Sequence, residues 1–258
     1  MRVPVVQHRS RRRRALGRRA LWTGGEFLVT AGVVLLLLVV HELWWTNREA
    51  RQGAEHQVQA LERQWATPGA GSGGTPSANS GLAGGSSPRR GTSADGSTAV
   101  TGSATAARRS QAYAILTIPR LHLRVPIAEG VSKQNVLNKG YVGHYPGTQQ
   151  PGQAGNFALA GHRNTHGEPF RYLPRLRLKD TVQVETSAAT YTYTVDKILP
   201  QTSASDSGVI RPIPRSTVRP AYGYSRPGYY ITLTTCTPEF TSRYRMAVWG
   251  TLTSTHLR

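Results

Sequence analysis

Seven segments after Gln111 alternate apolar and polar residues with a period of two, which is the pattern of half-buried β-strands. These segments are residues 112–118, 123–127, 155–162, 181–186, 190–199, 229–236 and 245–252. Helical signals are few: Ser132 can cap a short helix over 132–139 that Gly140 ends, and a second short helix is expected over 168–173. Seven or eight short strands in about 145 residues predict a mainly β domain, either a closed barrel or a sandwich.

A different pattern stands near the N-terminus, where residues 27–40 form an apolar run without a charged side chain. With Trp22 before it and Trp44 and Trp45 after it, the run reaches the roughly 20 residues that span a bilayer. A cleaved signal peptide or a buried helix is the alternative, but no A-x-A-like cleavage site follows the run. We therefore predict one uncleaved transmembrane helix over 26–45.

The net charge of +19 raises the question of nucleic-acid binding. Eight arginines lie between Arg2 and Arg19, and no acidic residue precedes Glu26. By the positive-inside rule, residues 1–25 form a basic cytoplasmic tail, and the chain after the helix lies outside the cell. Because much of the charge belongs to this tail, we predict no nucleic-acid partner.

Residues 46–110 connect the predicted membrane helix to the β domain. Residues 47–65 are polar with scattered apolar positions, so a short juxtamembrane helix is plausible, and 66–109 are mostly Gly, Ser, Ala, Thr and Pro. Such a composition predicts disorder. As a flexible coil from Arg51, the segment would reach about 40–45 Å. It is predicted to tether an extracellular folded domain over 111–258.

Cys236 is the only cysteine, and the predicted topology places it outside the cell, where exported thiols are usually paired. It ends an apolar strand just before the turn at Thr237 and Pro238. A buried structural cysteine is one explanation. The other is a nucleophile at a cleft, which reacts as the thiolate and therefore needs a histidine and a cation nearby.

The β domain contains candidates for both partners. His162 follows an apolar strand bounded by glycines, as Cys236 does, and His144 is the second choice. Arg243 and Arg245 precede or open the last strand and share a face. Either guanidinium could stabilise a developing oxyanion, or both could be solvated strand-end residues.

The sequence gives no sign of a cofactor. No group of residues has the spacing of a calcium loop or a zinc site, so no metal is predicted. A phosphate-binding loop and a dinucleotide fingerprint are also missing, so no nucleotide cofactor is predicted.

Three motifs resemble those of the sortase family. TLTTC at 232–236 is similar to the TLxTC signature, NFALAGHRNT around His162 to the second signature, and HYPGT at 144–148 to class E sortases of high-GC Gram-positive bacteria. The likeness covers residues 112–254. It implies an eight-stranded sortase barrel in which His162, Cys236 and an arginine converge, with Arg245 the better match and Arg243 the alternative.

The resemblance also implies roles. Cys236 would attack the Thr–Gly bond of a C-terminal sorting motif, LAxTG rather than LPxTG, and form a thioester. His162 would be the general acid and base, and Arg245 would stabilise the oxyanion. Tyr145, Thr234 and Thr235 would line the substrate groove. The implied partners are surface proteins that carry the motif and an amine of a lipid-linked peptidoglycan stem peptide.

Three other functions remain open at this point. A pilin-polymerising sortase shares the mechanism, but no Asp-Pro-aromatic lid motif precedes Gln111. An L,D-transpeptidase would carry Ser-x-Gly-Cys-x-Arg, where this chain has Thr-Thr-Cys-Thr-Pro. A non-catalytic, membrane-tethered β module could bind anionic wall polymers, with Cys236 buried.

Overall fold

The computed structural model describes residues 9–66 and 111–258. The start of the basic tail and the predicted tether from 67 to 110 lie outside the described residues. The chain divides into two units, Met1–Thr46 and Asn47–Arg258.

Helix α1 (Arg9–Ala66) runs through the predicted membrane span without a break. Its stretch from Gly25 onward contains an 18-residue window with a mean hydropathy of 2.2, so it is long and apolar enough to cross a membrane. The large apolar side chains of 27–40 are all exposed. The helix continues to Ala66, so the juxtamembrane helix is confirmed, and the flexible coil predicted from Arg51 is wrong up to that residue.

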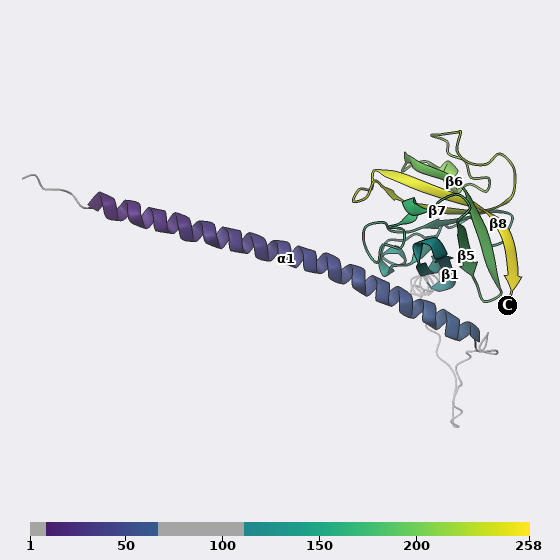
Figure 1. Cartoon of the computed structure of the whole chain (residues 1–258), viewed down its shortest axis with the longest axis horizontal. Coiled ribbons are helices and arrows are strands. Elements are labelled where there is room, and N and C mark those ends of the chain that lie inside the picture. Colours follow the sequence, from purple (N-terminus) through teal and green to yellow (C-terminus); the bar gives the residue numbers. More distant parts are fainter. Residues whose placement is uncertain (1–8, 67–110) are drawn as a thin grey trace, which may run out of the picture. The chain divides into compact units, whose positions relative to one another are not determined.

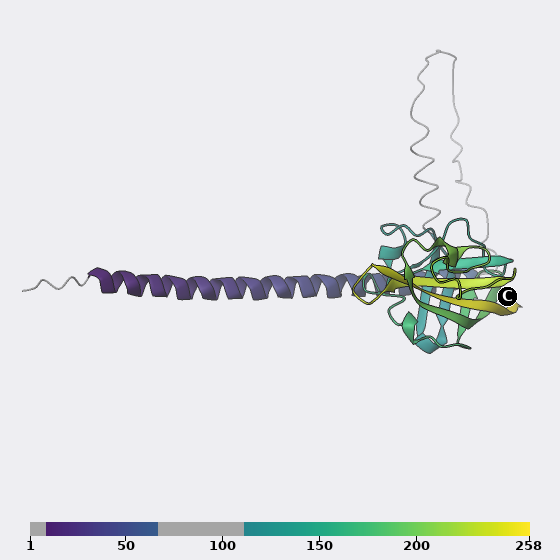
Figure 2. The same ribbon diagram turned by 90° about the horizontal axis from the view of Figure 1, so that it is seen from above.

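Eight strands close into a barrel in the unit that follows (Figures 1 and 2). They are β1 (Ala112–Ile118), β2 (Leu123–Glu129), β3 (Val142–His144), β4 (Gly155–Ala160), β5 (Thr181–Glu185), β6 (Ala189–Ser203), β7 (Tyr229–Thr237) and β8 (Tyr244–Leu257). The order around the barrel is β1-β2-β3-β4-β7-β8-β6-β5. Two neighbouring pairs, β2–β3 and β4–β7, are parallel, and the other pairs are antiparallel.

All seven strands expected from the alternation are present, and the barrel confirms the mainly β prediction. The eighth, β3, has three residues, too few to show a period of two. The short helices are all 3₁₀: η1 (Pro119–Leu121), η2 (Leu137–Lys139), η3 (Leu173–Arg175) and η4 (Ser207–Ile210). A helix over 168–173 does not form, because Glu168 has φ 52°, outside the helical region.

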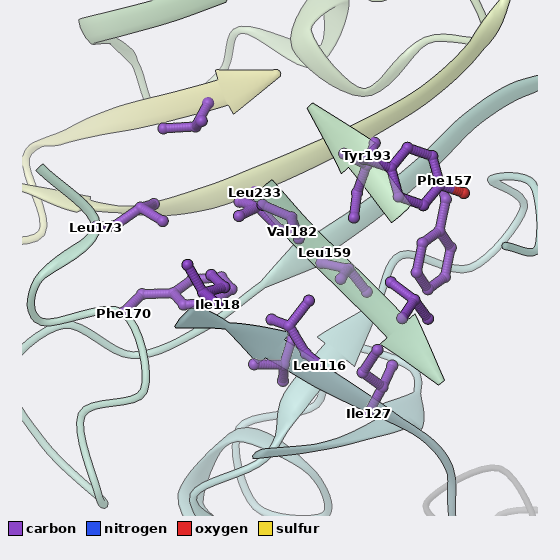
Figure 3. Packing of buried hydrophobic residues seen from close by; sticks show 14 of the residues in the cluster. Leu116, Ile118, Ile127, Phe157, Leu159, Phe170, Leu173, Val182, Tyr193 and Leu233 are labelled. Carbon is purple, nitrogen blue, oxygen red and sulfur yellow. The ribbon is translucent and has the colours of Figure 1, made fainter. Parts of the chain in front are cut away.

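Alternate residues of the strands fill the barrel interior. Phe157 and Leu159 of β4 meet Ile231 and Leu233 of β7 there, and several of the same cluster are labelled in Figure 3. The intervening residues face outward, which follows from the two-residue period of a strand. A strand residue can therefore take part in a surface site only if its side chain is on the outer face.

Two outer faces of the barrel are also covered. Helix η4 covers β7 and β8, where Val209 packs with Trp249. The second half of α1 covers the β1–β2 side, where Val58 and Leu61 pack with Ile115. The folded unit thus begins at Asn47, whereas the sequence placed its start at Gln111.

Candidate active site

Cys236 and Arg245 lie directly opposite each other on neighbouring strands. The antiparallel register of β7 and β8 pairs Cys236 with Arg245, and directly opposite residues project from the same face. That face is the outer one, because Leu233 of β7 and Met246 of β8 belong to the barrel core. Cys236 is half-buried, so its position is not that of a core cysteine.

His162 reaches the same place through the parallel pairing of β4 with β7. The register pairs Ala160 with Thr234, and the Gly161 N–H donates to the Thr234 carbonyl oxygen at 3.2 Å, so His162 leaves β4 beside the end of β7 that carries Cys236. Because side chains alternate along a strand, and Leu159 and Leu233 face the core, their neighbours Ala160 and Thr234 face outward. The histidine thus follows the end of β4, while the cysteine and the arginine lie opposite each other on β7 and β8.

Two neighbours define the state of the His162 ring. Nε2 donates a hydrogen bond of 2.9 Å to Oδ1 of Asn138, and the ring of His166 lies 5.4 Å away between centroids. Burial, followed by the charges of His166 and Lys133, lowers the pKa of His162 from 6.5 to about 4. The imidazole is therefore neutral at neutral pH, with Nε2 protonated and Nδ1 unprotonated.

Arg163 ties the histidine segment to the cysteine strand. Its Nη1 donates to the carbonyl oxygen of Cys236 at 3.3 Å and to Oγ1 of Thr237 at 3.0 Å. Because Arg163 directly follows His162, these bonds restrict the separation of the two strand ends. The sequence offered a signal here, since a cation stands next to the candidate histidine, but its partner is visible only in the fold.

Of the three predicted groove residues, two lie together and one does not. The Tyr145 hydroxyl is 3.1 Å from Oγ1 of Thr234, and Thr234 shares the outer face with Cys236. Thr235 is on the opposite face of β7, where its Oγ1 donates to the carbonyl oxygen of Gly161 at 2.9 Å. Thr235 thus braces the residue before His162 and does not line the face of Cys236.

His144, the second choice for the catalytic histidine, is a structural residue. Its side chain is 1% exposed, and its Nδ1 lies 2.6 Å from Oε2 of Glu129. Nε2 has Oγ1 of Thr148 at 2.9 Å. The ring packs on Phe157 of the core, with 4.8 Å between centroids. Both ring nitrogens are occupied, and the ring faces away from Cys236.

The two arginines also separate. Arg243 precedes β8, is exposed, and lies over the ring of Tyr244 at 5.2 Å. Arg245 is half-buried in β8, and its Nη1 donates to the carbonyl oxygens of Ser242 at 2.8 Å and Tyr244 at 3.0 Å. Register and burial favour Arg245.

Asn138 is, with Arg163, a site residue that the sequence analysis did not single out. It lies in η2, before β3, whereas His162 follows β4. Only the barrel topology brings the two residues together. Among residues 9–66 and 111–258, no group of three His, Cys, Asp or Glu side chains is placed to hold a metal ion. The prediction that no metal takes part stays a prediction.

A closed eight-stranded barrel with a cysteine opposite an arginine on β7 and β8, and a histidine just after β4, is the arrangement of the sortase class of transpeptidases. Residues 116–253 match the sortase domain model, and the chain belongs to the sortase family.

Relatives place the chain with class E. It is similar to sortase SrtE1 of Streptomyces coelicolor, with 42% identity over 88% of this chain and 55% of that protein. Sortase SrtE2 of the same organism is 33% identical over 90% of this chain and 81% of that protein. The chain thus spans about half the length of SrtE1 and four fifths of SrtE2.

Solved structures agree with this placement. The crystal structure of sortase E1 from Streptomyces coelicolor with a tripeptide in the active site is 51% identical, with a TM-score of 0.55 over 58% of this chain and 92% of that chain. Sortase E from Streptomyces avermitilis is 41% identical, with a TM-score of 0.51 over 57% of this chain and 91% of that chain.

Proposed function

We propose that this chain is a membrane-anchored transpeptidase that cleaves a C-terminal sorting motif between Thr and Gly and joins the new carboxyl end to a cell-wall amine. The observation that carries the proposal is the strand register, which pairs Cys236 with Arg245 on β7 and β8 and Ala160, two residues before His162, with Thr234, two residues before Cys236. A nucleophile, a proton carrier and an oxyanion donor are the groups that acyl transfer needs.

In the first half-reaction, the sulfur of Cys236 bonds to the threonine carbonyl carbon and the Thr–Gly bond breaks. The thiol proton passes to Nδ1 of His162 and then to the leaving glycine amine. Arg245 donates hydrogen bonds to the oxyanion of the tetrahedral intermediate. The product is a thioester between Cys236 and the threonine carbonyl.

In the second half-reaction, an amine attacks the thioester carbonyl and the C–S bond breaks. His162 accepts the proton of the incoming amine and returns one to the sulfur, so enzyme and proton count are restored. Neutral His162 suits this step, because the pKa of about 4 leaves Nδ1 unprotonated. Tyr145 and Thr234, joined by their hydroxyls, would line the groove for the motif.

The proposed setting is the cell surface. The apolar stretch of α1 would be a single-pass anchor, the arginine-rich end would lie in the cytoplasm, and the barrel unit would lie outside. Substrates would be surface proteins with an LAxTG-type motif. The acceptor would be the amine of a lipid-linked peptidoglycan stem peptide.

The test uses the full chain in detergent micelles with a fluorogenic LAxTG peptide, an LPxTG peptide and an amine acceptor. We expect Thr–Gly cleavage and an amine-linked product, faster with LAxTG, and loss of at least about 10³-fold in Cys236→Ala. Mass spectrometry of the acylated enzyme would locate the thioester on Cys236.

Failure to cleave either peptide, with Cys236 also inert to a bulky alkylating reagent, would contradict the proposal and favour a non-catalytic wall-binding module. In a parallel reaction, a pilin peptide with a lysine replaces the amine acceptor. Cleavage with joining only to that lysine would favour the pilin-polymerising alternative.

A further inference from the structure

One stripe of α1 is built into the barrel unit. Ala50, Ala54, Val58 and Leu61 are spaced by four, four and three residues, and all are at most 8% exposed. This spacing places them on a single helix face. The face packs on a cluster that includes Ile115.

The part of α1 that packs on the barrel, residues 47–66, is called here the seated segment. Its first turn binds the loop after His162. Asn47 donates from Nδ2 to Oε1 of Glu168 at 3.0 Å and accepts from the Gly167 N–H at 3.2 Å. Arg51 donates from Nη2 to Oε2 of Glu168 at 3.0 Å and from Nε to the Gly167 carbonyl at 3.2 Å. Two helix side chains thus make four hydrogen bonds to two consecutive loop residues.

This loop needs external support. His166, Gly167 and Glu168 have φ values of 51°, 81° and 52°, so two non-glycine residues adopt the left-handed region. Such conformations persist where surrounding contacts fix them. The Glu168 carboxylate side chain is 4% exposed and is also bound by Arg171 at 2.7 Å.

Both neighbours of the His162 ring lie on segments that α1 supports. His166, whose ring is tilted by 30° against that of His162, directly precedes Gly167. Asn138, which accepts from His162, is followed by Gly140, where an added Cβ would lie 2.7 Å from the carbonyl oxygen of Ala50. The helix therefore touches the loop on one side of His162 and the turn on the other.

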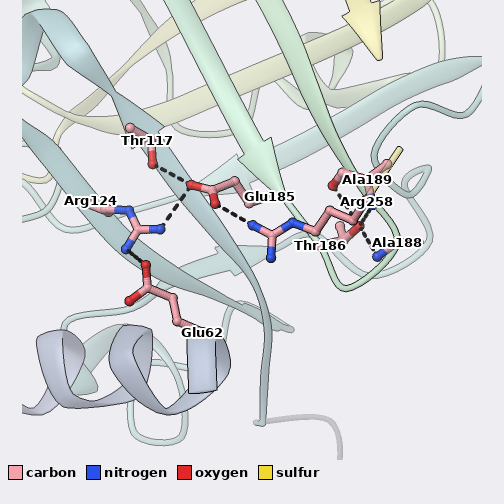
Figure 4. A network of polar contacts seen from close by, with 8 residues as sticks. All are labelled: Glu62, Thr117, Arg124, Glu185, Thr186, Ala188, Ala189 and Arg258. Carbon is pink, nitrogen blue, oxygen red and sulfur yellow. Dashed lines mark hydrogen bonds and ion pairs between the residues drawn. The ribbon is translucent and has the colours of Figure 1, made fainter. Parts of the chain in front are cut away.

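The far end of the seated segment is also fixed. Figure 4 shows Glu62 of α1 bound to Arg124 of β2, which in turn binds Glu185 of β5. The guanidinium of Arg258 lies 4.8 Å over the ring of Trp65. The segment is thus held along its whole length by the barrel.

We propose that residues 47–66 of α1 are a positioning element for His162, with Asn47 and Arg51 as positioning residues that act through Glu168. The inference rests on the proposed catalytic role of His162. Because α1 is one helix from Arg9 to Ala66, the element that carries the apolar stretch also orders the site. A change in how this helix is seated would change catalysis without touching substrate.

The experiment compares the full chain in detergent with Asn47→Ala/Arg51→Ala. Its matched control is Gln52→Ala/Gln64→Ala, two exposed positions of the same helix. We expect kcat for amine ligation to fall about tenfold in the first variant with KM nearly unchanged, since the orientation of His162 changes and the groove does not. The control should stay within about twofold. Hydrogen exchange over 161–172 should rise in the first variant alone, and Arg51→Lys should lose less than Arg51→Ala.

A second pair changes the other contact. Gly140→Ala adds a methyl group against Ala50, whereas Gly130→Ala, also at positive φ, meets nothing within 4 Å. We expect a larger fall in kcat for Gly140→Ala. Wild-type kcat and exchange in Asn47→Ala/Arg51→Ala would overturn the inference. A wild-type chain that cleaves neither peptide would refute the proposed function instead, and the exchange comparison would still decide whether the helix orders the loop.

Discussion

At the scale of single residues, the register separates two arginines that are two positions apart in the sequence. Arg245 is paired with Cys236, and Arg243 is exposed in the turn before β8. If Arg245 is the oxyanion donor, Arg245→Ala should lower kcat about 10²–10³-fold. Arg243→Ala should change it less than about threefold, because an exposed charge contributes little. Steady-state peptide ligation checks both, and equal losses would contradict the assignment.

His162 gives a second prediction at this scale, on stability. Its folded pKa of about 4 is below the unfolded value of 6.5, so between these pH values the unfolded chain binds a proton that the folded chain does not. The contribution of His162 to the free energy of unfolding is therefore lost as pH falls from 6.5 to 4. Relative to His162→Gln, the wild type should lose about 1–2 kcal/mol across this window, a value reduced for the partial exposure of the ring. Urea unfolding at several pH values measures it, and parallel pH profiles would contradict it.

At the scale of elements, the connection between β6 and β7 is organised by Asp206. This residue is 4% exposed and accepts hydrogen bonds from the hydroxyls of Thr202, Ser216 and Thr217 and from the Thr217 N–H. Burial alone would raise the pKa of Asp206, but these four bonds overcome that effect and lower it. The connection carries η4, which covers the outer face of β7 and β8.

Asp206→Asn should therefore loosen this connection and lower the free energy of unfolding by about 2–3 kcal/mol, because the substitution removes the charge and its amide nitrogen cannot accept the bonds made to one carboxylate oxygen. Faster hydrogen exchange over 204–228 would accompany the loss. The control is Asp196→Asn, an exposed aspartate of β6 that also accepts from hydroxyls, with an expected loss under about 1 kcal/mol. Equal losses for the two variants would refute this account.

At the scale of the whole molecule, the folded unit includes a helix that precedes the barrel by more than forty residues in the chain. Removing it exposes Ile115, which is fully buried, and the cluster around it. A chain that starts at Gln111 should be less stable than one that starts at Asn47 by about 3 kcal/mol, from the apolar area returned to water.

A third chain that starts at Thr67 separates the helix from the segment after it. We expect it to unfold at the same urea concentration as the chain from Gln111. A midpoint equal to that of the chain from Asn47 would show that the helix contributes nothing, contrary to the prediction.

Much of the fold could be predicted from local pattern. The alternation in segments such as 229–236 is caused by one buried and one outer face, so it predicts each strand without knowledge of its partners. The apolar run of 27–40 is likewise a property of the chain itself. The motifs around His162 and Cys236 identified the family for the same reason, since they are contiguous in sequence.

What the sequence by itself determined were the elements that a single segment defines: the strands, the apolar helix and the residues that end β4 and β7. Tertiary structure decided which of these meet. The register of β7 against β8 set Arg245 rather than Arg243 opposite Cys236, the barrel topology brought Asn138 to His162, and side-chain packing placed residues 47–66 of α1 against β1 and β2. The first contact depends on the register between two consecutive strands and the other two join segments further apart in the chain, and the periodicity of one segment encodes neither its register nor its partner.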